Sequence, residues 1–72
     1  MEIKTKEFIR KLRKYGRKNG FEVIYDEGHG KGSHGRVYLG GRFTTVKGAD
    51  KTIREGLLRK MCKDLGIGIE DL

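Results

Sequence analysis

The stretch HGRVYLGGRFTTV (residues 34–46) decides the fold of this 72-residue chain. Two runs rich in β-branched and aromatic residues flank the pair Gly40-Gly41. Glycines at this position tolerate the positive φ angles of tight hairpin turns. The pattern therefore predicts an antiparallel hairpin with strands over residues 34–39 and 42–46.

The two faces of this hairpin differ in character. Side chains alternate across a strand, so Val37 and Leu39 share one face, and Arg36 and Tyr38 share the other. Before the hairpin, the run FEVIY (residues 21–25) alternates in the same way and predicts a third strand. We therefore expect a sheet with one face buried and the other open to solvent.

The first helix is predicted over residues 5–18, ahead of the strands. Thr5 is expected to be its N-cap, and the helix should stop at Asn19-Gly20, because glycine accepts the left-handed backbone of a C-cap. Gly16 lies inside this helix and weakens the prediction for its last turn. Four residues at helical spacing form one apolar stripe: Phe8, Ile9, Leu12 and Tyr15.

The second helix is predicted after the hairpin, where Thr52 and Glu55 have the spacing of a capping box. It should end at Gly66, and residues 68–72 should add a short final turn. Gly56 inside the helix costs about 1 kcal/mol relative to Ala, which suggests a close backbone contact there. Six residues at helical spacing form its apolar stripe: Ile53, Leu57, Leu58, Met61, Cys62 and Leu65.

The predicted element order is α-β-β-β-α within a single domain that spans residues 1–72. Two amphipathic helices bury their apolar stripes when both pack on one face of a three-stranded antiparallel sheet. The predicted fold class is therefore α+β, with the second face of the sheet left uncovered.

Composition narrows the function. Lys and Arg total 17 against 10 Asp and Glu, and the formal net charge of +7 favours an anionic partner. No apolar run is long enough for a membrane span or for the core of a signal peptide. A single cysteine excludes an internal disulfide. We expect a small basic cytoplasmic domain with no membrane association.

The charge is concentrated near the N-terminus, where residues 1–18 carry eight Lys and Arg against two Glu. The cations opposite the apolar stripe lack interleaved acids, so they repel one another unless an anion such as a phosphate backbone relieves the repulsion. An ordinary solvated helix face is the alternative interpretation. These cations are Lys6, Arg10, Arg13 and Arg17.

A glycine-rich segment over residues 27–35 precedes the hairpin. Its GxGxxG spelling is followed by a strand and not by a helix, so it lacks the context of a dinucleotide-binding motif. It also lacks the first glycine and the Ser or Thr of a phosphate-binding P-loop. A zinc site from His29 and His34 with Asp26 or Glu27 has no supporting spacing, and we expect no metal.

RNA cleavage is a further interpretation of the same segment. An imidazole ordinarily titrates near neutrality, so a histidine such as His34 can accept the proton of a ribose 2′-hydroxyl or return one to a leaving oxygen. Gly32 lets the backbone approach a phosphate, and Lys31 or Ser33 can bind the phosphate oxygens. From the residues alone, a solvated hairpin loop is the simpler interpretation.

The remaining aromatic and thiol side chains divide between core and surface. Phe8, Tyr15 and Phe21 are expected in the core, whereas Tyr38 can stack on a base if it faces solvent beside Arg36. The thiol of Cys62 lies on the second apolar stripe and should be an inert core group.

Several of these residues together resemble the HicA family of bacterial and archaeal toxins. The resemblance covers almost the whole chain and is most specific at Gly-Ser-His followed by the hairpin and the next helix. The segments that carry it are Lys6-Glu-Phe-Ile-Arg10, Lys31-Gly-Ser-His34, Gly41-Arg42, Thr45-Val46, Gly56-Leu-Leu-Arg59, Leu65-Gly-Ile67 and Glu70-Asp-Leu72.

The resemblance implies a fold like that of a double-stranded RNA-binding domain. It implies a toxin of a type II toxin–antitoxin system, an mRNA interferase that cleaves mRNA without a metal or other cofactor. The catalytic histidine of the family corresponds to His34. A HicB-type antitoxin is implied as the partner that covers the active site. The expected RNA-binding residues are Lys31, Gly32, Ser33, Arg36, Lys6, Arg10, Arg13 and Arg17.

The chain departs from the family pattern at three places. Gly35 stands where many members have a second histidine, and Lys47 stands where a proline often follows the third strand. The first helix and the loop before Lys31 are longer than in short members. His29 matches no family motif and receives no role.

Overall fold

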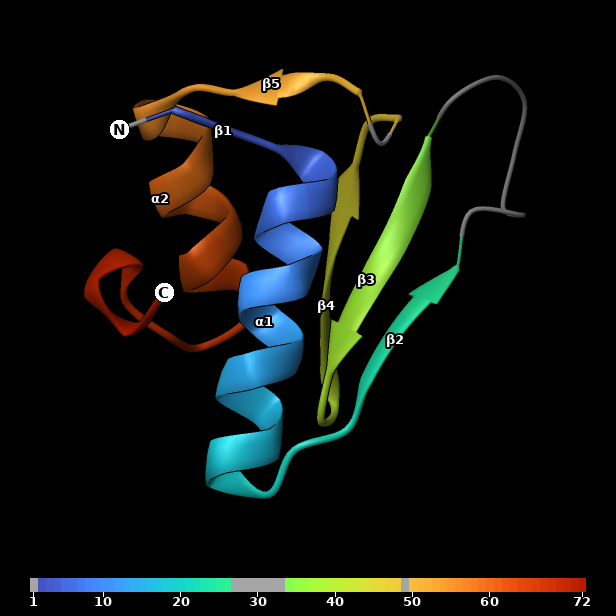
Figure 1. The fold of residues 1–72 in the computed structure, drawn as a ribbon, viewed down its shortest axis with the longest axis vertical. Helices are drawn as coiled ribbons and strands as arrows, with labels where there is room; N and C mark the ends of the chain where they lie inside the picture. Colours follow the sequence, from blue (N-terminus) through green and yellow to red (C-terminus); the bar gives the residue numbers. More distant parts are fainter. Residues whose placement is uncertain (1, 27–33, 49) are drawn as a thin grey trace.

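The computed structural model describes residues 2–26, 34–48 and 50–72. Two helices lie side by side against a sheet, and the N-terminal segment crosses near the start of the second helix (Figure 1). The elements follow in the order β1 (Ile3–Lys4), α1 (Thr5–Asn19), β2 (Val23–Asp26), β3 (Gly35–Leu39), β4 (Arg42–Val46), β5 (Thr52–Ile53), α2 (Glu55–Asp64) and a short 3₁₀ turn, η1 (Ile69–Asp71).

The three longer strands form an antiparallel sheet in the order β2-β3-β4. The hairpin is confirmed, with Gly40 in the turn at φ 61°. In the sheet register Tyr38 lies opposite Ile24 on one side and Phe43 on the other. The strand β2 begins at Val23, two residues later than predicted. The N–H of Phe21 still bonds to the carbonyl of Gly16, 2.8 Å away, as the chain leaves α1.

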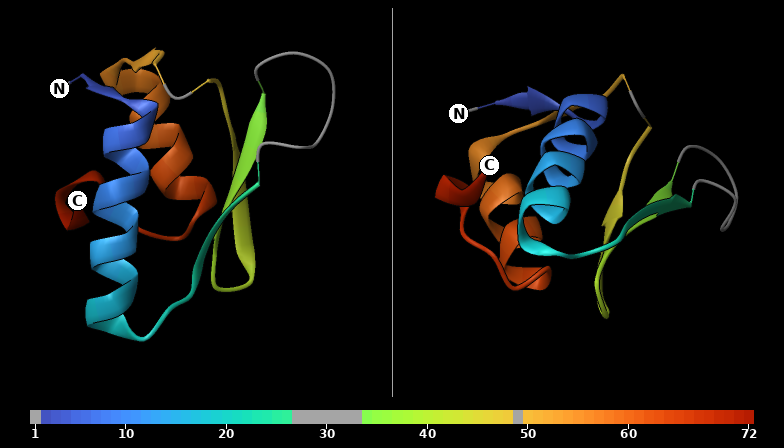
Figure 2. Two further views of the ribbon diagram at one scale, coloured as in Figure 1. Left: turned by 45° about the vertical axis from the view of Figure 1, so that its right-hand side comes forward. Right: turned by 60° about the horizontal axis from the view of Figure 1, so that its bottom comes forward.

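The predicted α+β fold and its α-β-β-β-α order are confirmed, with the two short strands β1 and β5 added. Both helices cover the same face of the three-stranded sheet, which leaves its other face open (Figure 2). The core between the layers contains Phe8, Ile9, Leu12, Val37, Leu39, Val46, Ile53, Leu58, Met61, Cys62 and Leu65. No helix among the described residues has the length and apolar character needed to cross a membrane.

Both predicted N-terminal helix caps are wrong, and one contact explains why. The strands β1 and β5 pair antiparallel, with Ile3 opposite Ile53, so Thr52 lies in a strand and α2 begins later, after Arg54. Thr5 is the first residue of α1 and is fully buried. Its N–H donates to the carbonyl of Lys51 at 2.9 Å, so this threonine holds the start of α1 against the residue that precedes β5.

The close backbone contact expected at Gly56 occurs instead at Gly16. A Cβ at Gly16 would lie 2.5 Å from the carbonyl oxygen of Phe21 and 2.9 Å from Cγ2 of Val23. At Gly56, a Cβ would meet no described atom within 4 Å. Gly16 therefore lets β2 return close to α1, and Gly20 closes the helix with a φ of 79°, as predicted.

Two apolar residues that were expected in the core lie at the surface. Leu57 is 45% exposed because α2 turns this side of its first turn away from the core that Leu58 enters. Phe21 is 48% exposed and stacks on the half-buried Tyr15, with ring centroids 6.3 Å apart. Leu57 therefore lies at the outer edge of the second apolar stripe, and Phe21 lies beyond the edge of the core.

Candidate active site

His34 lies immediately before β3, at one end of the sheet, and its side chain is exposed. The neighbouring Gly35 is buried and pairs with Val46 of β4, so the backbone that carries His34 is held by the ladder. A position beside a paired strand end suits a catalytic side chain, because the sheet holds the adjoining backbone.

A pocket of about 250 Å³ opens beside His34. Two cations, Lys47 from the end of β4 and Lys51 from the segment before β5, line it together with the imidazole. The same pocket has three threonines and an apolar wall. Its other lining residues are Thr5, Thr45, Val46, Thr52, Ile53, Leu57 and Met61.

The backbone of Lys51 is held by its contact with Thr5, the first residue of α1. Its carbonyl accepts the N–H of Thr5 at 2.9 Å and the Thr5 hydroxyl at 3.4 Å. The start of α1 therefore anchors the segment that carries this lysine near His34. An ammonium group in this place can stabilise negative charge on a phosphate oxygen.

Neither pocket lysine was among the phosphate-binding residues predicted from the sequence. Lys47 gave one signal, since it replaces a proline that is frequent in the resembling family. Lys51 gave none, because its approach to His34 depends on the pairing of β1 with β5 across the chain. Of the other predicted phosphate-binding residues, Lys31, Gly32 and Ser33 lie outside the described residues, as does His29.

The predicted RNA-binding residue Arg36 lies on the open face of the sheet. Its guanidinium carbon stands 4.9 Å from the centroid of the Phe43 ring, and the Tyr38 ring lies 5.7 Å from the same ring. Tyr38 is therefore on the side of Arg36, as expected, and is half-buried among these neighbours. This cluster faces away from the helices.

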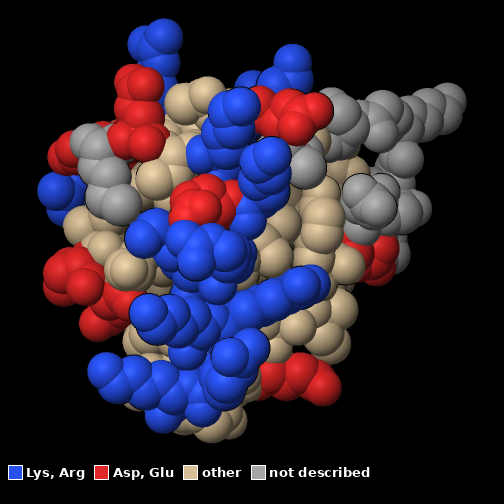
Figure 3. Space-filling model, in the orientation of Figure 1, with Lys and Arg blue, Asp and Glu red and all other residues tan. Residues whose placement is uncertain are grey.

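The predicted cations Lys6, Arg10, Arg13 and Arg17 are all exposed on α1. The expectation that no acid is interleaved among them is wrong, because Glu7 forms an ion pair with Arg10. The hydrogen bond from Arg10 lowers the pKa of Glu7, and the same bond raises the pKa of Arg10. Lys and Arg side chains still dominate the surface over this helix (Figure 3).

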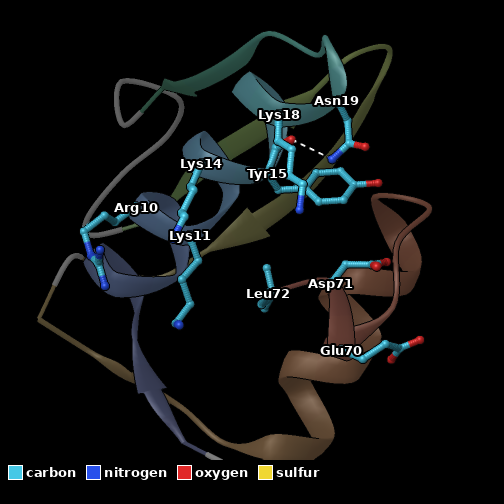
Figure 4. Close-up of a pocket in the computed structure, with 9 residues that line it drawn as sticks. All are labelled: Arg10, Lys11, Lys14, Tyr15, Lys18, Asn19, Glu70, Asp71 and Leu72. Atoms are coloured by element: carbon cyan, nitrogen blue, oxygen red, sulfur yellow. Dashed lines mark hydrogen bonds between the residues drawn. The ribbon is translucent and has the colours of Figure 1, made fainter.

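A second hollow, about 480 Å³, lies between α1 and the C-terminal turn. Figure 4 shows lysines of α1 on one side of it and Glu70 and Asp71 on the other, with Leu72 between them. Of the four α1 cations predicted to bind RNA, only Arg10 lines this hollow. The cations that the structure brings together here are Arg10, Lys11, Lys14 and Lys18.

The described residues contain no group of three or more His, Cys, Asp or Glu side chains arranged to hold a metal ion. Cys62 is buried in the core, as predicted. Burial, with a smaller contribution from the negative charges of Asp71 and Glu70, raises the pKa of its thiol to about 11. This cysteine is therefore a neutral packing group at physiological pH.

Comparison with known proteins gives a family. A protein-family model described as the HicA toxin of bacterial toxin–antitoxin systems matches residues 5–67. Among curated proteins and solved structures, no significant match to the chain was found. The family match spans both helices, the sheet, His34 and both pocket lysines. The chain therefore belongs to the HicA toxin family of bacterial toxin–antitoxin systems, which implies an antitoxin partner.

Proposed function

We propose that this chain is an mRNA interferase, a metal-independent endoribonuclease that serves as the toxin of a type II toxin–antitoxin system. The observation that supports the proposal most directly is the grouping of His34 with Lys47 and Lys51 around one pocket. An acid–base group beside two cations is an arrangement suited to phosphodiester cleavage.

The reaction uses the 2′-hydroxyl of the RNA as its nucleophile. The imidazole of His34 carries one of the two proton transfers, either from the attacking 2′-hydroxyl or to the departing 5′-oxygen, and solvent water carries the other. The P–O5′ bond breaks as the new P–O2′ bond forms, so the products carry a 2′,3′-cyclic phosphate and a 5′-hydroxyl. The ammonium groups of Lys47 and Lys51 stabilise the charge on the non-bridging oxygens, with Lys31, Gly32 and Ser33 as further phosphate contacts.

The basic surface of α1 provides affinity for RNA without reading its sequence. Phosphate contacts position a nucleic acid, and each neutralised phosphate makes binding weaker at high salt. We assign this role to Lys6, Arg10, Arg13 and Arg17, and Arg36 contributes from the sheet. The antitoxin partner is of the HicB type and inhibits the toxin by covering His34.

The test compares the chain with His34→Ala in RNA cleavage and in growth arrest. If His34 is the proton carrier, cleavage falls by about 10²–10⁴-fold, while RNA binding is retained because the cations are unchanged. Equal cleavage by the two proteins would exclude the assignment. Tight, salt-sensitive RNA binding without cleavage products in either protein would favour the alternative, a non-catalytic RNA-binding module of the same fold.

A further inference from the structure

The pocket at His34 continues along the edge of the sheet. A groove of about 340 Å³ lies between β4 and α2. Thr45, Leu57 and Met61 line both this groove and the His34 pocket, so the two hollows are contiguous. The sheet order places β4 at an edge of the three-stranded sheet, which leaves this side of the strand unpaired within it.

The middle of the groove has an apolar wall that is open to solvent. Phe43 of β4 is 47% exposed and Leu57 of α2 is 45% exposed, and both line it. Two large apolar side chains that line one surface groove mark a binding site more often than scattered single ones do. The Phe43 ring packs with Arg36 and Tyr38 on the open face of the sheet, so Phe43 borders the groove from that face, at the edge strand β4.

Charged groups stand at both ends of the groove. Lys47 and Lys51 lie at the His34 end, and Lys60 lies at the far end. Beside Lys60, Oδ2 of Asp64 accepts hydrogen bonds from the Thr44 hydroxyl at 3.1 Å and from Lys60 at 3.4 Å. In the described part of the chain, Oδ1 of Asp64 accepts no hydrogen bond.

We propose that this groove binds a nucleobase of the same RNA strand close to the cleaved phosphate, with the base against Phe43 and Leu57 and its exocyclic amino group donating to Asp64. The proposal rests on the proposed ribonuclease function. It selects RNA as the occupant because a single strand alternates anionic phosphates with flat apolar bases, and the groove alternates cations with an apolar wall.

The spacing fits one short strand of RNA. Phe43 lies opposite Tyr38, four residues along β3 from His34. At roughly 3.3 Å per residue this places Phe43 about 13 Å along the sheet from His34. Adenine, cytosine and guanine carry exocyclic amino groups and uracil does not, so Asp64 should favour the first three bases over uracil.

Binding is measured in a His34→Ala background, where RNA stays intact, with short oligo(C) and oligo(U) as probes. Phe43→Ala is expected to weaken oligo(C) binding by about 5- to 150-fold, the range found when an aromatic partner of a base is removed. The matched control is Phe21→Ala, because Phe21 is equally exposed at 48% but lies outside the groove. Leu57→Ala should also weaken binding, with Ile24→Ala, 48% exposed, as its control.

Asp64 is tested through base preference. We expect the chain to bind oligo(C) about 2- to 10-fold more tightly than oligo(U), the effect of one net hydrogen bond. Asp64→Asn should narrow this difference, because an amide can also donate to the carbonyl oxygen of uracil. Circular dichroism confirms that each variant is folded.

The outcomes separate the groove from the chemistry. Weaker RNA binding in Phe43→Ala and Leu57→Ala, with both controls unchanged, supports the groove as a base-binding site. If the chain with His34 intact cleaves no RNA, that absence of cleavage overturns the proposed function but not the groove. If Phe43→Ala and Leu57→Ala bind and cleave RNA as well as the control variants do, the groove assignment is overturned and the proposed ribonuclease function is not. Loss of antitoxin binding with unchanged RNA binding would assign the groove to a protein and also overturn it.

Discussion

The basic face of α1 and the pocket at His34 both suit a polyanion, but they are built differently. The helix face is formed by residues close in sequence and carries many cations over an exposed surface. The pocket combines one imidazole with two lysines from three separate segments. A surface of the first kind supplies long-range attraction, whereas the second kind fixes a few groups around one phosphate.

This difference implies a division of labour. Charges on an exposed helix are screened by salt and tolerate movement of the ligand, so they contribute mainly to affinity. The pocket lysines lie beside the candidate proton carrier, so their contribution should appear in the rate of cleavage. If the chain acts as proposed, the net charge of +7 should contribute to RNA affinity far more than to catalysis.

The largest expected effect is in the pocket. Replacing Lys47 and Lys51 together by Gln should lower kcat for RNA cleavage by about 10²–10³-fold, as when a preorganised donor to the reacting oxygen is removed. KM should change little, because most phosphate contacts remain on α1. Single-turnover cleavage measures the effect, and a rise in KM with unchanged kcat would show that these lysines serve only binding.

The helix face should show the opposite pattern. Replacing Lys6, Arg13 and Arg17 by Gln should raise the Kd for single-stranded RNA and leave single-turnover kcat unchanged at saturating RNA. The slope of log Kd against log salt should fall by about 2, from 0.7 per lost phosphate contact. A triple Gln variant at Arg54, Arg59 and Lys63 removes equal charge elsewhere and is the control. Equal losses of affinity in the two variants would indicate a general charge effect with no role for this helix face.

Local patterns in the sequence predicted the scaffold of both regions well. The hairpin followed from Gly40-Gly41 between alternating strands, and the end of α1 followed from Gly20, because each depends on neighbouring residues. The cations of α1 were predictable for the same reason. The grouping in the hollow beside the C-terminal turn was not, since it depends on where residues 70–72 return.

The pocket was only half predictable. His34 was found from its motif, but the two lysines were missed, because the pairing of β1 with β5 brings distant segments together. The same pairing overruled the capping signals at Thr5 and Thr52, whose backbone groups it uses. Tertiary contacts outweigh a local cap, which contributes only about 1 kcal/mol.

A third prediction concerns the contact that holds α1 against the sheet. Gly16→Ala places a methyl group 2.5 Å from the Phe21 carbonyl oxygen, so α1 and β2 must separate. We expect the free energy of unfolding to fall by about 1–3 kcal/mol, as for other overpacked sites. The control is Gly56→Ala, which meets no described atom and should be neutral or stabilising by up to about 1 kcal/mol. Urea unfolding of both variants measures the difference, and equal stabilities would contradict the close approach.

The smallest effect at neutral pH concerns Cys62, beneath the acidic side of the hollow. Burial raises the pKa of its thiol to about 11, above the value of about 8.5 for an unfolded cysteine. The neutral thiol is therefore favoured in the folded chain, and its contribution is complete below the unfolded pKa. As pH rises towards 11, the unfolded thiol ionises first and the contribution is lost.

Cys62→Ala isolates this contribution, because every other titrating group is shared with the parent chain. The stability advantage of the parent over the variant should stay constant up to about pH 8 and then shrink by about 2–3 kcal/mol as the pH approaches the raised value. Alkylation at pH 8 should be slow in the folded chain and fast in urea, since only the exposed thiolate reacts. Rapid alkylation of the folded chain would show that the core beneath Glu70 and Asp71 opens readily, and the acidic side of the hollow could not then hold a fixed position opposite the lysines of α1.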